Sequence, residues 1–418
     1  AILEWNGVML EAIRKQNSAP GLASRKLAIV HLAVFEALKT APPQSTEPIV
    51  SAGTGTPPTE GTPIYPAGIF TGAASRCAQL LYPPERARVS PLLERWRARA
   101  SDPIAFAAGE RVGIRSADTI LTERQSDGSS RQVTYVPSKE PGIWQRTAPK
   151  FRPPELPHWK DVTPFSLGRA DQFRPPPPPA VDSGAYADEL AEVRNLGALD
   201  SRSRSADQTE IAHFWACFNY TGTPAGHWND IATRTLPHER YSVLELARAY
   251  ALLNVAMADA GIAAWDCKYH YRSWRPIQAI PATSPDASWQ SLLEAPPHPE
   301  YVSGHSTFSG AGCAALQHLI GVDEVEFEIH SDSLPGRTRR YRSLSQAAHE
   351  IGQSRIFGGI HFQSGNREGL KLGSQVAAFV IANPLMRPDR KDPHEAAGSL
   401  SDPGPGDAPD LQAGQHQL

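Results

Sequence analysis

The chain has 418 residues, 40% of them hydrophobic, and its 41 Lys and Arg against 44 Asp and Glu give a net charge of −3. This length is sufficient for a large buried core. The near-neutral balance gives no general electrostatic case for binding nucleic acid. No apolar run reaches the roughly 18 residues that a membrane span needs. Attraction to an anion would therefore have to come from a local cluster of cations.

Apolar residues at intervals of three and four predict helices along most of the chain. In the first half they cover 1–16, 24–40, 68–82, 84–100 and 102–124. In the second half they cover 184–196, 204–217, 225–235, 240–268, 304–320, 343–357 and 366–383. Strand patterns are few and do not alternate with helices, which argues against an α/β sheet. The sequence therefore predicts an all-α protein built from helical bundles.

The 39 prolines indicate long irregular connections between these helices. One connection is predicted at 41–67, and another from about 122 to 183, where the prolines at 174–179 favour a polyproline II helix. The tail lacks apolar periodicity. We therefore predict N-terminal helices with Pro-rich connections over 1–183, a helical bundle carrying the functional site over 184–384, and a C-terminal extension over 385–418.

The cysteines and the first residue bear on the cellular compartment. Four cysteines are widely spaced and show no zinc-type pattern, so we interpret them as free buried thiols: Cys77, Cys217, Cys267 and Cys313. The sequence starts at Ala1 rather than at a methionine. We expect a secreted or periplasmic protein whose signal peptide has been removed, with a trimmed chain as the alternative.

Three short segments of the second half carry cations and histidines, and the first is KYHYRSWRP (268–276). Lys268 and Arg275 are seven residues apart, close to two helical turns, so both cations would share one face of a helix. Pro276 disfavours helical backbone at Arg275, which predicts the guanidinium at a helix end. Two cations on one face usually form a solvated surface, but the aromatic residues around them make that interpretation less favourable.

The second segment is HPEYVSGHSTFSGAG (298–312). A helix that begins near Gly304 would direct its free N–H groups and the positive end of its dipole toward an anion. Ser303 adds a hydroxyl group, and Gly304 lets an anion approach the backbone. His305 can transfer a proton near neutral pH. The alternative is that Ser303 simply caps the helix.

The third segment is SRIFGGIHFQSGN (354–366). Arg355 and His361 would lie on different faces of an unbroken helix, but Gly358 and Gly359 can end the helix and let them converge. Arginine binds oxyanions through paired hydrogen bonds, and histidine can coordinate vanadium or become phosphorylated. Together the three segments supply three cations, two histidines and a helix start, which suits a tetrahedral oxyanion of high charge.

In order and spacing, the three segments resemble the signature K-x6-R-P, P-S-G-H and S-R-x5-H-x3-D. That signature is shared by the vanadium-dependent haloperoxidases and the type-2 phosphatidic-acid-phosphatase-like acid phosphatases. Two positions depart from it, because Val302 replaces the proline and Gly365 replaces the aspartate. Segments such as EWNGVMLEAIR and GHWNDIA also resemble secreted bacterial haloperoxidase homologues, so the resemblance extends over most of the chain.

The resemblance implies a vanadate cofactor and assigns roles to the matching residues. Five residues would bind the oxyanion, three by charge and two by hydrogen bonds: Lys268, Arg275, Arg355, Ser303 and Gly304. His361 would be the direct ligand of vanadium, or the phosphorylated nucleophile in a phosphatase. His305 would be the acid–base residue, with Lys268 aiding protonation.

The resemblance also bears on the halide. Among similar haloperoxidases, histidine at the position of His298 accompanies bromide oxidation and phenylalanine accompanies chloride oxidation, which favours bromide or iodide here. The alternative for His298 is a surface histidine in a Pro-rich loop. Trp265 is predicted to wall the halide pocket, with core packing as the alternative.

Three functions remain open at this point. The first is the oxidation of halide by hydrogen peroxide to hypohalous acid. The second is phosphomonoester hydrolysis through a phosphohistidine, in which His361 needs an acidic partner that Gly365 cannot supply. In a peroxidase a backbone carbonyl can orient His361, and Asn366 or Glu368 are candidate substitutes for the aspartate. The third is a non-catalytic oxyanion-binding homologue.

Some partners follow from the same resemblance. It implies hydrogen peroxide and halide as substrates, leaves room for a small organic substrate, and implies a homodimer. Neither nucleic acid nor a membrane span is expected. Asp230 is our candidate for the acidic partner of Arg355.

Overall fold

The computed structural model describes residues 1–41, 66–283 and 287–383. Helices dominate these residues and confirm the prediction of an all-α protein. The first five are α1 (Ile2–Lys15), α2 (Pro20–Lys39), α3 (Pro66–Leu81), α4 (Arg86–Ala98) and α5 (Pro103–Glu123). After a long irregular stretch follow α6 (Gly184–Leu196), α7 (Ala206–Phe214), α8 (Thr223–Thr235), α9 (Val243–Tyr271), α10 (Pro276–Thr283), α11 (Gly304–Ile320), α12 (Leu344–Phe357) and α13 (Gln363–Ala382).

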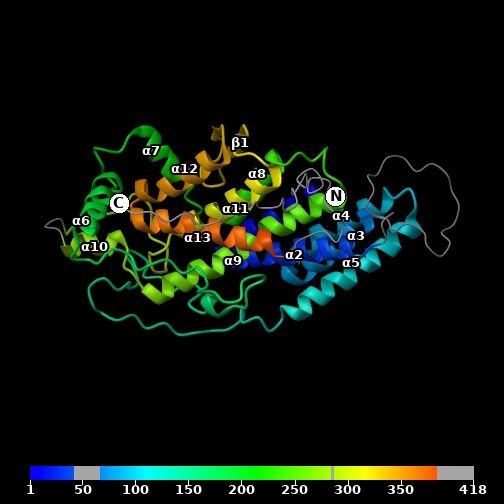
Figure 1. Cartoon of the computed structure of the whole chain (residues 1–418), viewed down its shortest axis with the longest axis horizontal. Helices are drawn as coiled ribbons and strands as arrows, with labels where there is room; N and C mark the ends of the chain where they lie inside the picture. Colours follow the sequence, from blue (N-terminus) through cyan, green and yellow to red (C-terminus); the bar gives the residue numbers. More distant parts are fainter. Residues whose placement is uncertain (42–65, 284–286, 384–418) are drawn as a thin grey trace, which may run out of the picture. The chain divides into compact units, whose positions relative to one another are not determined.

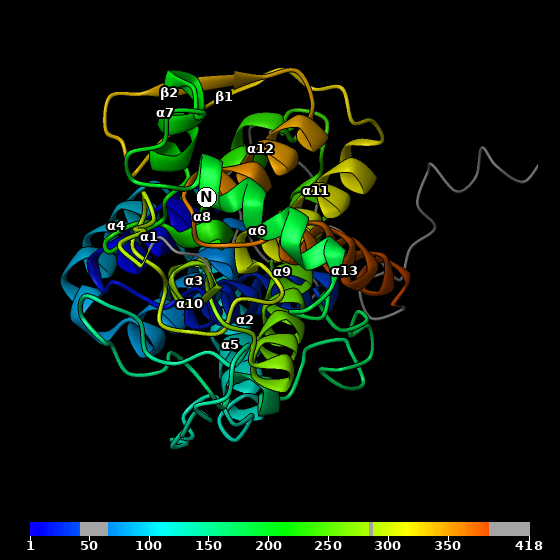
Figure 2. The same cartoon turned by 90° about the vertical axis from the view of Figure 1, so that its left-hand side faces the viewer.

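Every predicted helix is present, and the α-helix α10 and a two-stranded hairpin were not predicted. The short helix α10 begins and nearly ends with proline, which hid its helical character. The strands β1 (Phe327–His330) and β2 (Thr338–Tyr341) form an antiparallel hairpin in which Phe327 pairs with Tyr341. It lies at the top of Figure 2, where β1 contacts α8 and β2 contacts α12. Two short 3-10 helices, Pro83–Glu85 and Trp159–Asp161, complete the regular structure of the described residues.

The 29-residue helix α9 is the centre of the bundle. It begins with a capping box in which Ser242 and Glu245 each bind the other's backbone N–H. Nearly every residue from Ala247 to Tyr269 is buried, as expected of a helix that is apolar on all sides. α9 packs against α2, α11 and α13 (Figure 1). Its C-terminal end thereby lies next to the start of α11.

Helices α11 and α13 approach each other backbone to backbone. A Cβ atom on Gly310 would lie 2.1 Å from the carbonyl oxygen of Leu370, and one on Gly373 would lie 2.0 Å from that of Thr307. No side chain larger than hydrogen fits at either position. This close packing fixes the start of α11 against the start of α13, where two of the predicted segments lie.

The described residues, 1–41, 66–283 and 287–383, belong to one compact unit, in which α2 of the first half packs against α9 of the second. The division predicted near residue 184 stays a prediction. The irregular stretch predicted at 122–183 is confirmed, apart from the short 3-10 helix within it. The predicted C-terminal extension and residues 42–65 of the first predicted connection lie outside the described residues.

Two further predictions concern the whole chain. All four cysteines are free thiols, as interpreted from their spacing, although Cys217 is only partly buried. Within the described ranges, no helix combines the length and the apolar character that crossing a membrane requires.

Candidate oxyanion site

Lys268 and Arg275 come together in a way that the spacing did not predict. Helix α9 ends at Tyr271 because Arg272 adopts a left-handed conformation with φ of 55°, and Pro276 opens the next helix. Arg275 therefore lies in the link between two helices. The prediction that both cations share one helix face is wrong, because the chain leaves the helix between them.

The segment 298–302 binds both cations through its backbone. Arg275 Nε donates to the carbonyl oxygen of His298 at 3.0 Å. The ammonium of Lys268 donates to three carbonyl groups, at 3.1 Å and 2.9 Å for the first two: those of Pro299, Glu300 and Val302. An ammonium has three hydrogens, so these bonds engage all of them. Lys268 thus adds positive charge to the site while its hydrogens hold this segment in place.

Arg275 also fixes the protonation of His361. Its Nη1 lies 3.0 Å from His361 Nε2 and donates to the carbonyl oxygen of Ile360 at 2.7 Å. Because a guanidinium can only donate, Nε2 must be the accepting nitrogen of a neutral imidazole. The proton of His361 then sits on Nδ1, which is 2.7 Å from Glu300 Oε1. This is the tautomer that leaves a lone pair on Nε2 for a ligand.

Glu300 is the acidic partner of His361 that sequence reasoning missed. Its side chain is buried, with the residue 1% exposed, and Oε1 also accepts from the backbone N–H of Phe362 at 3.2 Å. Neither proposed substitute has this role, since Asn366 accepts from Ser306 Oγ instead and Glu368 lies next to Arg367. Glu300 is an acidic residue inside the second segment and could have been considered as this partner. It was not considered because the signature has its aspartate at position 365.

The start of α11 is where the sequence predicted it. Ser303 is the N-cap, with Oγ accepting from the N–H of Ser306 at 3.3 Å, and the helix begins at Gly304. The capping alternative for Ser303 is therefore confirmed. It is compatible with anion binding, because a helix leaves the N–H groups of its first turn without intrahelical acceptors. His305 Nε2 lies 3.1 Å from the carbonyl oxygen of Trp215.

Arg355 and His361 converge as predicted. Helix α12 ends at Phe357, and Gly359 has a φ of 73°, which turns the chain back toward the site. Arg355 Nη1 lies 3.1 Å from His305 Nε2. Its Nη2 is buried and has no hydrogen-bond partner among the described residues. A buried donor left unpaired lowers the free energy of unfolding by about 1–3 kcal/mol. A hydrogen bond from Nη2 to a bound anion would offset this cost.

The suggested partner of Arg355, Asp230, was wrong. Its carboxylate binds Arg14 instead, with Oδ2 3.1 Å from Arg14 Nη2. No residue in the described ranges forms an ion pair with Arg355 at the distances that define one. Its positive charge therefore remains uncompensated within the protein.

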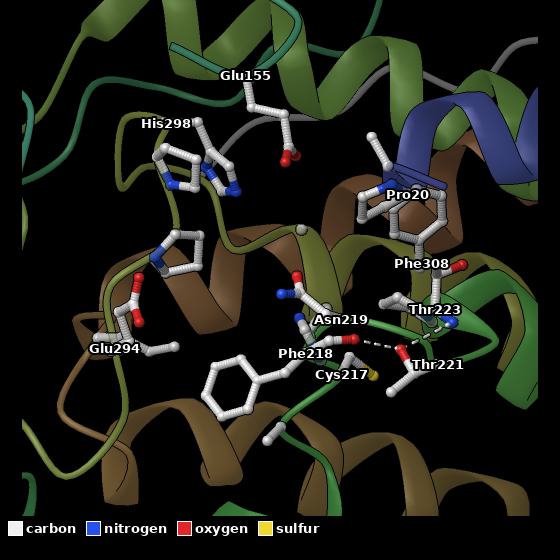
Figure 3. Close-up of a pocket in the computed structure, with 18 of the residues that line it drawn as sticks. Pro20, Glu155, Cys217, Phe218, Asn219, Thr221, Thr223, Glu294, His298 and Phe308 are labelled. Carbon is white, nitrogen blue, oxygen red and sulfur yellow. Dashed lines mark hydrogen bonds between the residues drawn. The ribbon is translucent and has the colours of Figure 1, made fainter. Parts of the chain in front are cut away.

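One cavity of about 210 Å³ joins most of the predicted site residues. Six of them line it: Trp265, His298, Gly304, His305, Arg355 and His361. Three more are buried and are not among its lining residues: Lys268, Arg275 and Ser303. Figure 3 shows Glu155 and His298 on one side of the cavity and Cys217, Phe218 and Asn219 on the other.

The two residues predicted for the halide pocket lie side by side. The rings of Trp265 and His298 have centroids 5.1 Å apart, and both line the cavity. The alternative of a surface histidine is wrong for His298, which is buried and whose Nδ1 accepts from Arg275 Nη2 at 2.9 Å. Trp265 is buried as well, so it both packs in the core and forms part of the cavity wall.

The electrostatics of the site favour an anionic guest. Burial, reinforced by the neighbouring arginines, holds the pKa of His361 and His305 well below the ordinary value of histidine. Burial also lowers the pKa of Arg275 to about 9 and that of Arg355 to about 10. In each case burial is the largest cause, because it disfavours the positively charged form of the group. A bound oxyanion would supply negative charge that favours the charged form of the two arginines.

The donor set fits vanadate or phosphate. The Nε2 lone pair of His361, which accepts from Arg275 Nη1 in this structure, is the one suited to a bond with vanadium or phosphorus. Arg355 Nη2 together with the start of α11 suits the surrounding oxygens. A helical bundle with this arrangement around one cavity is a candidate oxyanion-binding site. The family model for the VCPO second helical-bundle domain matches residues 248–385, which contain every predicted site residue. This match covers 138 of the 418 residues, and over them the chain is similar to the vanadium-dependent haloperoxidases.

The chain is also similar to individual vanadium haloperoxidases. The chain is 26% identical over 394 residues to a vanadium chloroperoxidase of Curvularia inaequalis, covering 74% of this chain. It spans 64% of the length of that relative. The structure of a bacterial vanadium-dependent iodoperoxidase superposes with a TM-score of 0.78 at 29% identity, over 91% of this chain and 95% of that one.

A bacterial vanadium-dependent chloroperoxidase shares the fold at lower identity. It superposes with a TM-score of 0.68 at 18% identity, over 87% of this chain and 92% of the other. The helical architecture is thus common to relatives whose sequences have diverged widely.

Proposed function

We propose that the chain is a vanadate-dependent haloperoxidase, which oxidises halide with hydrogen peroxide to hypohalous acid. The observation that carries the proposal is the state of His361: Glu300 holds its Nδ1–H, and its Nε2 lone pair faces buried cationic donors. The reaction converts halide, hydrogen peroxide and one proton into hypohalous acid and water. Vanadate, when bound, would supply the Lewis acidity that activates the peroxide.

The protein's own residues would hold the oxyanion and manage protons. His361 would be its covalent ligand through Nε2, and the unpaired Nη2 of Arg355 would donate to one of its oxygens. The backbone N–H groups at Gly304 would donate to another. Lys268 and Arg275, which are not among the lining residues, would contribute charge, since their hydrogens already bind other groups.

His305 is placed to move the protons that the reaction requires. It lines the cavity next to Arg355, and burial and that guanidinium lower its pKa, so the imidazole is neutral at pH 7. A neutral imidazole can take a proton from hydrogen peroxide. It can then return the proton to the oxygen that leaves as water.

For the halide we propose bromide or iodide rather than chloride. His298 and Trp265 form one wall of the cavity, and the histidine is the residue that accompanies bromide oxidation in similar haloperoxidases. The iodoperoxidase among the structural relatives supports the same preference.

Phosphomonoester hydrolysis remains a second candidate because of one observation. A phosphohistidine mechanism needs an acid that orients the nucleophilic imidazole, and Glu300 supplies it at 2.7 Å from Nδ1. The objection raised by Gly365 therefore no longer stands.

One experiment separates the two functions. The purified protein is incubated with orthovanadate, hydrogen peroxide and each halide in turn, and separately with a chromogenic phosphomonoester without vanadate. We expect vanadate-dependent oxidation of bromide and iodide, little of chloride, and no hydrolysis. Hydrolysis that vanadate inhibits, without halide oxidation, would establish the phosphatase instead.

A further inference from the structure

The carboxylate of Glu300 occupies the space next to Gly365. A Cβ atom on Gly365 would lie 2.3 Å from Glu300 Oε1 and 3.1 Å from its Cδ, so the carboxylate would have to shift to admit one. The position at which the family signature has aspartate is thus filled by another residue's carboxylate. An aspartate at 365 and the present Glu300 could not both be accommodated.

The backbone around Glu300 leaves its side chain little freedom to move away. Its N–H donates to the carbonyl oxygen of Ser273 at 2.9 Å, and its own carbonyl accepts from Lys268 Nζ at 2.9 Å. Close by, the N–H of Ser303 donates to the carbonyl oxygen of Gly365, also at 2.9 Å. The segments 300–303 and 361–365 are therefore joined by backbone and side-chain bonds at the same place.

We propose that Glu300 is the positioning residue of His361 and that it has taken over the role of the aspartate missing at position 365. The glycine at 365 is then a requirement of this arrangement, because only glycine leaves room for the carboxylate. The exchange moves the acid from the start of α13 to the segment before α11. It rests on the proposed function only in that vanadate is taken as the group that His361 binds.

The physical consequence concerns both nitrogens of His361. A carboxylate that accepts from Nδ1–H fixes the ring orientation and the tautomer, and it makes Nε2 a stronger donor to a ligand. Such outer partners typically contribute 10- to 100-fold to the affinity for the bound group. The same bond occupies Nδ1 and leaves Nε2, which accepts from Arg275 Nη1, as the nitrogen that vanadate would bind.

The test is to measure vanadate affinity by titration calorimetry, which does not depend on halide oxidation. We expect Glu300→Ala to weaken vanadate affinity about 10- to 100-fold. Gly365→Asp alone should also weaken it, since the new side chain collides with Glu300. The double variant Glu300→Ala, Gly365→Asp should recover affinity to within a few-fold of the parent, because it restores one acid at the position that the family signature uses.

Two further variants test whether the effect comes from the charge of Glu300 and is specific to that residue. Glu300→Gln keeps the volume and an accepting oxygen but removes the charge, so it should fold and bind vanadate more weakly than the parent. Glu189→Gln is the matched control, because that carboxylate accepts from the neighbouring Ser364 Oγ at 2.7 Å and is not bonded to His361. It should leave the affinity unchanged.

Two results would overturn the inference. The first is parental affinity in both Glu300→Ala and Glu300→Gln, and the second is a double variant that binds no better than the weaker of its single variants. Failure of the proposed function would look different. A parent protein that binds vanadate in a Glu300-dependent way but oxidises no halide would contradict the peroxidase assignment and leave the positioning role intact.

Discussion

Two buried histidines show what separates the core of this protein from its site. His31 on α2 is 1% exposed, with Nε2 3.1 Å from Asn6 Oδ1 and its ring stacked on Tyr250. His361 is just as buried, but a carboxylate and a guanidinium flank its two nitrogens. Burial alone therefore says nothing about function here. What marks His361 as the candidate functional histidine is a charged partner on each nitrogen and an unpaired donor of Arg355, which lines the same cavity.

The contrast between His31 and His361 would be wrong if His361 were not needed for halide oxidation. We expect His361→Ala to lower vanadate-dependent halide oxidation by roughly 10³-fold or more, the scale typical of losing a central catalytic group. The initial rate with bromide or iodide measures it. His330→Ala, on the exposed end of β1, is the control and should keep the parental rate. A similar rate in both variants would contradict the assignment of His361.

His305 tests whether binding and proton transfer are separate within the site. We expect His305→Ala to bind vanadate within a few-fold of the parent but to oxidise halide about 10²-fold more slowly, because the proton acceptor is missing. Calorimetry and initial rates on the same preparation give both quantities. Parental turnover would show that another group handles the protons.

The packing beneath the site is expected to respond through stability. Gly373→Ala forces a Cβ against the backbone of Thr307 and should lower the free energy of unfolding by about 1–3 kcal/mol. Gly7→Ala on α1, where a Cβ meets nothing within 4 Å, should instead be neutral or slightly stabilising. Urea unfolding followed by circular dichroism compares them. Equal changes in the two variants would contradict the close packing of α11 and α13.

The pH dependence of stability tests the assignment of His31 as a neutral core histidine. Burial lowers its pKa to about 3, whereas the unfolded chain protonates histidine near 6.5. Between these values the unfolded state binds the extra proton, so stability falls as the pH falls, by up to about 1.4 kcal/mol per pH unit. In His31→Gln, whose amide can still bind Asn6, this contribution is absent. Its acid-induced unfolding should have a shallower pH dependence, and an unchanged slope would count against the neutral core histidine.

Sequence reasoning found the helices and the residue types of the site because both follow local rules. Periodicity marked α9 and α11, and Gly358 and Gly359 signalled the turn that brings Arg355 to His361. The position of Arg275 was missed since it depends on the left-handed Arg272, a conformation that no pattern announces. Glu300 was missed because its partner lies 61 positions further along the chain, and that contact exists only after two segments have packed.

A crystal structure of the protein grown with orthovanadate tests the role of His361 most directly. We expect a single vanadate in the cavity, bonded to His361 Nε2, with Glu300 still accepting from Nδ1–H and Arg355 Nη2 donating to a vanadate oxygen. A structure in which vanadate binds elsewhere, while Nε2 of His361 stays hydrogen-bonded to Arg275, would contradict it.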